Sequence, residues 1–233
     1  MATLYLIPVP LGPVSPDTCL PLDTLAVARR LDHFVVERAK TARAHLKAMG
    51  HPLPIQSLQI EELNEHTPAA AIPLLLAPLK AGHDVGLLSE AGCPAVADPG
   101  SALVMAAHRE NIPVVPLIGP SSILLALMAS GLGGQRFAFH GYLPAREPER
   151  GQKIRELEKA ARRDRATQLF IETPYRSAAL LDALATALSP DSTISVGADL
   201  SLPGQLVQTR SAKGWRGCTD AVRDKLVVFG IGV

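Results

Sequence analysis

Residues 85–100 read VGLLSEAGCPAVADPG, and this stretch gives the clearest indication of the fold. The apolar run Val85–Leu88 predicts a buried strand, and the small, acidic and proline residues after it predict a loop. The loop ends in Asp98-Pro99-Gly100, and a helical pattern follows over Ser101–Arg109. Open α/β sheets bind ligands where a buried strand leads into such a loop and returns as a helix. The stretch therefore predicts an α/β fold with a ligand loop at residues 89–100.

Composition narrows the class of protein. The chain has 233 residues, 47% of them apolar, which is enough for one large domain or two small ones. No apolar run reaches the roughly 18 residues of a membrane helix, and the start lacks the basic region of a secretory signal. The cysteines (Cys19, Cys93 and Cys218) form no CxxC pair, which argues against zinc and disulfides and predicts a reducing, cytoplasmic location. The net charge of +1 gives the chain as a whole no signature of nucleic-acid binding. With only 4% aromatic residues, a surface on which bases stack is also disfavoured.

Strand and helix patterns alternate along the chain. Apolar runs at residues 4–9, 33–37, 54–60, 84–89 and 112–118 predict the strands of a mainly parallel sheet. Later strands are predicted at residues 137–142, 167–172, 193–198, 205–209 and 225–231. We expect two domains, an N-terminal α/β domain at 1–117 with a mainly parallel sheet and a C-terminal α/β domain at 118–233 with a mixed sheet.

Three of the predicted helices have unusual composition. Residues 68–80 contain two interior prolines, which limit the length of a helix. Residues 123–130 are so apolar that we expect this helix to be buried on every side. Residues 146–165 carry a net charge of +3, which favours a solvated face over a polyanion site.

Three loops are predicted to leave strand ends, at residues 8–13, 89–100 and 119–122. In a parallel sheet these loops share one edge, where they offer small side chains, backbone groups and carboxylates. Such an edge suits a neutral or cationic small molecule. The chain has no GxxxxGK[ST] motif and no GxGxxG after its first strand, which disfavours phosphate-cradle and Rossmann dinucleotide sites. The alternative is that the prolines and glycines only turn the chain.

Several loop side chains are candidates for chemistry. Glu90 and Asp98 are suited to bind a ligand hydroxyl or ammonium group, although Asp98 also suits a turn or a helix cap. Cys93 is interpreted as a small packed residue in preference to a nucleophile. Glu65 either lines a cleft or starts a helix. The histidines form no motif such as HExxH, so no metal is predicted.

The motifs resemble a known family. LLSEAGCPAVADPG at 87–100, VVPLIGPSSILLALMASGL at 114–132 and FAFHGYLP at 137–144 resemble the tetrapyrrole (corrin/porphyrin) methylase superfamily. The chain is most similar to its ribosomal RNA small subunit methyltransferase I branch, which reads SDAGTPLISDPG at 89–100 and PGPSALLAALSASGL at 118–132. YLIPVPLG at 5–12 and FIETPYR at 170–176 extend the resemblance over almost the whole chain.

The resemblance implies two α/β domains with S-adenosylmethionine in a cleft between them, in a fold that is not Rossmann-type, and a homodimer. It also implies methyl transfer to a ribose 2′-hydroxyl of rRNA in the small ribosomal subunit. The cofactor contacts that it implies are Pro10, Gly12, Gly92, Cys93, Asp98, Ser121, Ser122, Tyr175 and Leu200.

Three hypotheses for the function stay open: methyl transfer to rRNA, methyl transfer to a small molecule, and cofactor binding without catalysis. An oxygen acceptor needs a base, for which Glu37, Glu65 and Glu90 are candidates. Of the branch's motif at residues 37–43 only Glu37 and Arg43 are kept here, and both basic residues of its motif at residues 198–202 are lost. This loss favours a methyltransferase that acts on a tetrapyrrole or other small molecule, or a non-catalytic S-adenosylmethionine-binding module.

Overall fold

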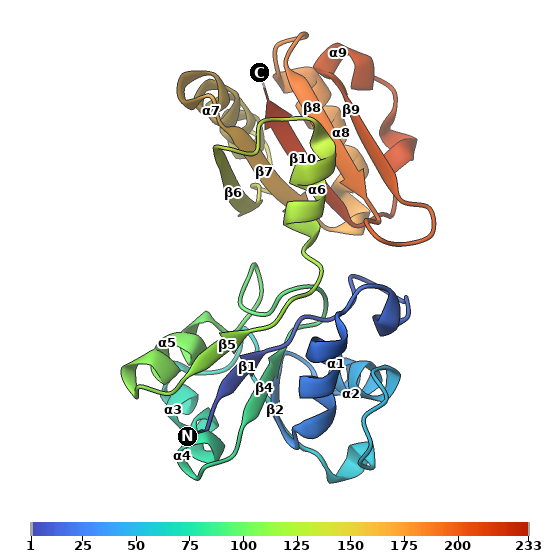
Figure 1. Ribbon diagram of the computed structural model, residues 1–233. Helices are drawn as coiled ribbons and strands as arrows, with labels where there is room; N and C mark the ends of the chain where they lie inside the picture. Colours follow the sequence, from blue (N-terminus) through green and yellow to red (C-terminus); the bar gives the residue numbers. More distant parts are fainter. Residues whose placement is uncertain (1, 233) are drawn as a thin grey trace. The chain divides into compact units, whose positions relative to one another are not determined.

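The computed structural model describes residues 2–232, which form two compact units that divide between Ser121 and Ser122 (Figure 1). The sequence placed the division between residues 117 and 118, and the outermost residues of both predicted domains lie outside the described part. We propose that each unit is a domain. Each is considered by itself below.

The first unit is built on a five-stranded sheet in the order β3-β2-β4-β1-β5. Its elements are β1 (Leu4–Leu6), α1 (Leu22–Arg30), β2 (His33–Val36), α2 (Ala39–Ala48), β3 (Gln59–Glu62), α3 (Ile72–Leu75), α4 (Ala77–Lys80), β4 (Val85–Leu88), α5 (Ser101–Arg109) and β5 (Val114–Pro116). All neighbouring strands pair in parallel. The carboxyl ends of the strands, and the loops that follow them, therefore share one edge of the sheet.

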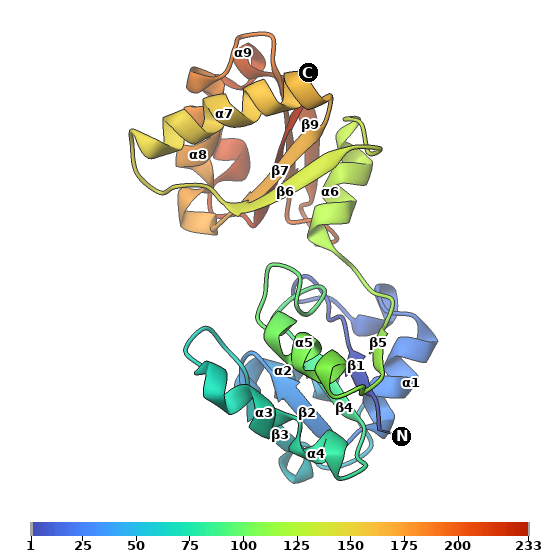
Figure 2. The ribbon, with the colours of Figure 1, turned by 90° about the vertical axis from the view of Figure 1, so that its left-hand side faces the viewer.

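Helices cover both faces of this sheet (Figures 1 and 2). On one face, Leu25 of α1 and Leu46 of α2 pack against Phe34. On the other face, Leu103 of α5 packs with Val85 and with residues of α3 and α4. Parallel strands buried on both faces read as continuous apolar runs, which is why VGLL could be recognised as a strand.

The second unit contains a mixed sheet in the order β6-β7-β10-β8-β9. Its elements are α6 (Ser122–Ser130), β6 (Phe137–Tyr142), α7 (Glu149–Asp164), β7 (Thr167–Glu172), α8 (Pro174–Ala187), β8 (Thr193–Ala198), β9 (Leu206–Ser211), α9 (Ala212–Trp215) and β10 (Val227–Gly232). β6 and β7 pair in parallel, and the other pairs are antiparallel. The core on one face is formed with α7, α8 and α9, while Ile123 and Leu127 of α6 pack on the other face. The predicted α/β class is confirmed, with one parallel and one mixed sheet.

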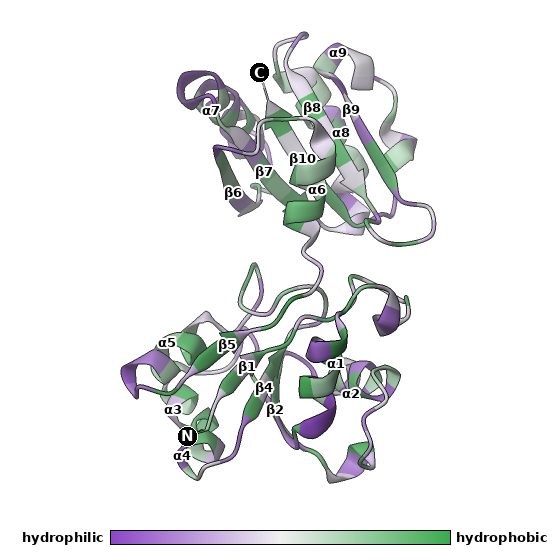
Figure 3. Ribbon diagram, viewed as in Figure 1, coloured by the Kyte–Doolittle hydropathy of each residue, from purple (hydrophilic) through white to green (hydrophobic). Residues whose placement is uncertain are grey.

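The expectation that residues 123–130 are buried on every side is wrong. Leu124 is 57% exposed and Met128 is 78% exposed, so α6 buries only one side. Figure 3 shows α6 as an apolar helix and α7 as a largely hydrophilic one. α7 nevertheless buries Ile154 and Leu157, and also the charged Glu158, while most of its other charged residues form the solvated face that was predicted.

Proline changes three predicted elements. Residues 68–80 do not form one helix but a 3₁₀ turn (Ala69–Ala71) followed by α3 and α4, because prolines lack the N–H that a helix interior needs. The charged helix begins at Glu149, after Pro148, and not at residue 146. The predicted strand 54–60 is wrong in position, because Pro54 precedes a 3₁₀ turn and β3 starts only at Gln59. Within residues 2–232, no helix combines the length and the apolar character needed to cross a membrane.

Candidate functional site

The three predicted loops meet at the carboxyl edge of the first sheet. Val9 and Gly92 form an antiparallel bridge, with N···O distances of 2.9 and 3.1 Å between their backbones. The Cys93 thiol donates to the carbonyl oxygen of Pro120 at 3.4 Å. The loops after β1 and β4 are thus joined by backbone hydrogen bonds, and the Cys93 thiol joins the loop after β4 to the loop after β5.

The loops approach one another so closely that glycine is required at one position. A Cβ atom added at Gly119 would lie 2.3 Å from Cβ of Pro8, a distance that real Cβ atoms do not reach. The loop after β5 can therefore lie against the loop after β1 only because residue 119 lacks a side chain.

The loop after β4 holds unusual backbone conformations. Ala95 and Ala97 have φ angles of 65° and 63°, in the left-handed region that ordinary residues avoid. Each such residue costs roughly 1–2 kcal/mol, and strain of this kind gathers at ligand-binding sites. The loop is therefore shaped by its surroundings and not by the preference of its own residues.

Three carboxyl groups gather beside these loops. The backbone N–H of Glu90 donates to Oε2 of Glu37 at 3.2 Å, which joins the ends of β4 and β2. The Thr41 hydroxyl donates to Oε1 of Glu90 at 2.5 Å, and Nε of Arg38 lies 3.7 Å from the same oxygen. Asp98 is the third member, and it is close enough to both glutamates for their charges to act on it.

Burial and mutual repulsion set the protonation of these groups. Burial, followed by the negative charges of Glu37 and Glu90, raises the pKa of Asp98 to about 6, against the opposing effect of the Ser89 hydroxyl. Burial also raises the pKa of Glu37. The pKa of the Cys93 thiol is raised by burial and then by Asp98, so this cysteine remains a thiol and is a poor nucleophile.

Asp98→Asn is expected to stabilise the protein at high pH. The pKa of Asp98 is higher in the folded than in the unfolded chain, so the folded state is progressively destabilised as pH rises from about 4 to about 6. Asparagine cannot ionise and removes this penalty, which is about 1–2 kcal/mol after allowance for solvent screening. Urea unfolding should show the variant more stable than wild type at pH 8 and close to it at pH 4. Glu61→Gln on the exposed side of β3 is the control, and an equal gain at both pH values would contradict the prediction.

The remaining cofactor residues predicted in the first unit lie on the same loops. Pro10 is buried and Gly12 is half-buried in the loop after β1, and Ser121 is half-buried at the end of the loop after β5. Glu65, in contrast, has an 84% exposed side chain that pairs with exposed His66. Their roles stay predictions.

Three predicted cofactor residues belong to the second unit. Ser122 is half-buried at the start of α6. Tyr175 is 77% exposed near the start of α8, with the Arg176 guanidinium 5.7 Å from its ring centre. Leu200 is buried in the turn between β8 and β9. Their contacts with a cofactor also stay predictions.

Sequence reasoning missed two residues of α2 that position Glu90. Thr41 donates to its carboxylate, and Nε2 of His45 lies 3.0 Å from its carbonyl oxygen. Residues four apart share one face of a helix, so the spacing of Thr41 and His45 was an available signal. The sequence did not indicate that this face is turned toward the loop after β4.

Comparisons with known proteins agree with this fold. The family model described as Tetrapyrrole (Corrin/Porphyrin) Methylases matches residues 3–213. A Mesorhizobium japonicum protein named ribosomal RNA small subunit methyltransferase I is 37% identical over 198 residues, which are 85% of this chain and 63% of that protein. A Vibrio cholerae protein of the same name is 31% identical, over 88% of this chain and 67% of its own length. The chain thus spans about two thirds of the length of these relatives, or less.

Solved structures support the same assignment at the level of fold. The crystal structure of the methyltransferase CobJ superposes with a TM-score of 0.64 at 20% sequence identity, covering 99% of this chain and 93% of that one. The resemblance drawn from the motifs at residues 87–100 and 114–132 is confirmed by the family match, which includes both. This chain belongs to the tetrapyrrole (corrin/porphyrin) methylase family.

Proposed function

We propose that this chain is an S-adenosylmethionine-dependent methyltransferase that methylates a ribose 2′-hydroxyl of small-subunit rRNA. Members of its family use S-adenosylmethionine as the methyl donor, which supports the cofactor. The names of the relatives support small-subunit rRNA as the acceptor molecule, and the ribose 2′-hydroxyl rests on the resemblance of the motifs. The observation that carries the proposal is the edge where the loops after β1, β4 and β5 meet beside three carboxyl groups.

The chemistry of this edge fits the cofactor. S-adenosylmethionine carries a positively charged sulfonium and an ammonium group, and its ribose hydroxyls are hydrogen-bond donors. The carboxylates of Glu90 and Asp98 complement positive charges and accept hydrogen bonds, which leaves Glu37 for the acceptor. When bound, the cofactor supplies an electrophilic methyl group. The protein's own part is to align the acceptor and to exclude water, which together are worth up to about 7–11 kcal/mol.

We further propose Glu37 as the base that takes the proton from the acceptor hydroxyl. Burial raises its pKa, and a base is most effective when its pKa approaches the working pH. Glu90 is less suited, because its Oε1 atom already accepts a hydrogen bond from Thr41 and lies close to the positive charge of Arg38. Glu65 is exposed to water, so it has no comparable desolvation.

The surface of α2 favours RNA over a small acceptor. Lys40, Arg43 and Lys47 are all exposed, and the helix contains no acidic residue. Arg38, directly before the helix, is 67% exposed. Arg38 lies 3.7 Å from Glu90, and Thr41 and His45 of α2 contact the same residue, so this basic helix runs past the carboxyl cluster, where its cations suit a phosphate backbone. A tetrapyrrole acceptor or a non-catalytic binding module would not need this basic face.

The test is methyl transfer from labelled S-adenosylmethionine to small ribosomal subunits that lack the modification. We expect label in the rRNA. Calorimetry should show cofactor binding by wild type that is lost in Ser121→Trp, because the bulky side chain would occupy the space beside the loop after β5 where we propose that the cofactor binds. Arg43→Glu should lower transfer at least tenfold without changing cofactor binding, because it removes an attraction for phosphate.

The matched control is Lys159→Glu on the exposed side of α7, which should leave transfer unchanged. Cofactor binding without label in rRNA would exclude the proposed acceptor. Label in a porphyrinoid instead would support the small-molecule alternative, and no cofactor binding by wild type would exclude a methyltransferase altogether.

We also propose a homodimer in the cytoplasm. The exposed apolar residues Leu124 and Met128 of α6 are of the kind that a subunit contact buries, and the three cysteines are free thiols, as in a reducing compartment. Light scattering of the purified protein would distinguish a dimer from a monomer.

A further inference from the structure

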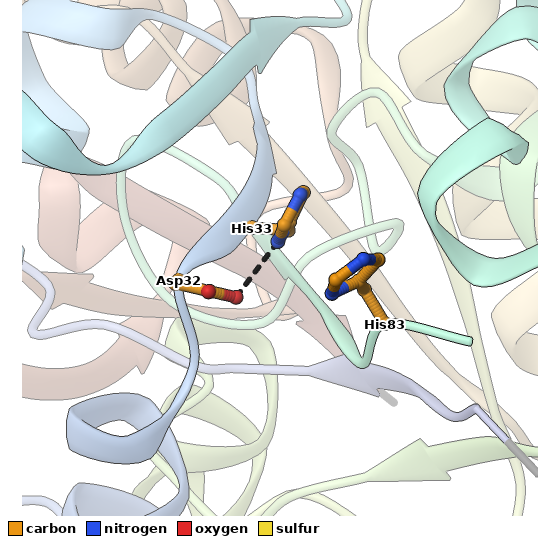
Figure 4. A group of neighbouring side chains, drawn as sticks. All are labelled: Asp32, His33 and His83. Carbon is orange, nitrogen blue, oxygen red and sulfur yellow. Dashed lines mark hydrogen bonds and ion pairs between the residues drawn. The ribbon is translucent and has the colours of Figure 1, made fainter. Parts of the chain in front are cut away.

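Two histidines and an aspartate meet at the amino edge of the first sheet (Figure 4). Nδ1 of His33 lies 2.7 Å from Oδ1 of Asp32. The rings of His33 and His83 stack, with centres 4.6 Å apart and planes at 29°. One ligand atom from each residue lies within 4.8 Å of the others, so the three side chains point to one small volume.

The parallel register of the sheet produces this meeting. His33 is the first residue of β2 and pairs with Val85, the first residue of β4. His83 lies in the turn just before β4, and Asp32 lies just before β2, so both occupy the same end of neighbouring strands. This is the edge opposite to the loops after β1, β4 and β5, and the group is therefore separate from the proposed methyl-transfer site.

We propose that Asp32, His33 and His83 bind one divalent transition-metal ion, with zinc as the best match. Two imidazoles and a carboxylate are ligands that zinc accepts, and a water molecule completes four-coordination. With bonds of about 2.0–2.2 Å, tetrahedral ligands lie roughly 3.3–3.5 Å apart. Asp32 and His33 must separate slightly and the more distant ligand atoms must approach, which small side-chain rotations achieve.

The surroundings suit a metal ion. The Asp32 side chain is 57% exposed, so its carboxylate is accessible to an ion from solvent. Asp32 and His83 are exposed, so the group is open to solvent and a water ligand can reach it. Neighbouring Asp84 is not proposed as a metal ligand, because both of its carboxylate oxygens already accept hydrogen bonds. Oδ2 accepts from Nη1 of Arg30 and Oδ1 accepts from the backbone N–H of Thr3, each at 2.8 Å.

Binding would join the start of β2 to the turn before β4. An ion that binds only the folded chain stabilises it by mass action, so zinc at 100 times its dissociation constant should raise Tm by roughly 5–10 °C. The effect concerns stability and does not depend on the proposed methyl transfer.

The experiment is a titration of the untagged full chain with zinc chloride in competition with a chromophoric chelator. We expect one equivalent of zinc with a dissociation constant in the micromolar range. His83→Ala and His33→Ala should each weaken binding at least tenfold and abolish the rise in Tm, while Asp32→Asn should weaken binding less. His83 lies in an exposed turn, so its variant should keep the fold, as circular dichroism would verify.

His108→Ala is the matched control, because His108 is an exposed histidine of α5 outside the group. Equal zinc binding by wild type and His83→Ala, or an equal loss in His108→Ala, would mean adventitious binding by surface histidines and would overturn the proposal. Absence of zinc binding by wild type would overturn it as well, whatever the result of the methyl-transfer assay.

Discussion

Glu37→Gln is expected to lower kcat for methyl transfer by about 10²- to 10⁴-fold, the range for loss of a general base. Glutamine has the same size and keeps an oxygen that can accept the hydrogen bond now donated by the Glu90 backbone N–H. The loop after β4 should therefore keep its shape, and only the ability to take up a proton is lost. Single-turnover transfer from labelled S-adenosylmethionine measures the rate, and calorimetry should show cofactor affinity within a few-fold of wild type.

Two other glutamates provide the controls for this variant. Glu65→Gln should change the rate by less than about three-fold, because an exposed carboxylate in water offers little catalytic advantage. Glu90→Gln should weaken the hydrogen bond with Thr41 and change the rate mainly by shifting the loop after β4. The pH dependence of the rate should stay that of wild type. A rate for Glu37→Gln near that of wild type, or a larger loss in Glu65→Gln, would exclude Glu37 as the base.

Gly119→Ala is expected to destabilise the protein by about 1–3 kcal/mol, the usual cost of overpacking. The new methyl group would meet Cβ and Cγ of Pro8 at 2.3 and 2.8 Å, and a proline ring cannot rotate away. The two loops must separate, so cofactor affinity should fall at least tenfold. Thermal unfolding should show Tm lower by roughly 3–10 °C for a chain of this size.

Gly134→Ala is the matched substitution, since its added Cβ meets no atom within 4 Å. It should leave Tm and cofactor binding close to wild type. If Gly119→Ala instead matched Gly134→Ala in both measurements, the close approach of the loops after β1 and β5 would not be a requirement of the fold.

Local pattern was enough to predict the buried strands. The strands predicted at 167–172 and 193–198 coincide with β7 and β8, and Val85–Leu88 is β4 itself. A continuous apolar run between turn residues has few other solutions, because its side chains must be buried on both faces. Prolines were equally informative, although their effect was stronger than predicted at residues 68–80.

The sequence alone was enough to establish the α/β class and the motifs of the family, and it predicted a ligand loop at residues 89–100. Only the tertiary structure decided that one side of α6 is exposed, that Thr41 holds Glu90, and that His33 meets His83. The physical reason is that burial patterns and turn residues act over a few neighbouring positions. Contacts between residues about fifty positions apart depend instead on which strands are neighbours and on their register, which no local pattern specifies.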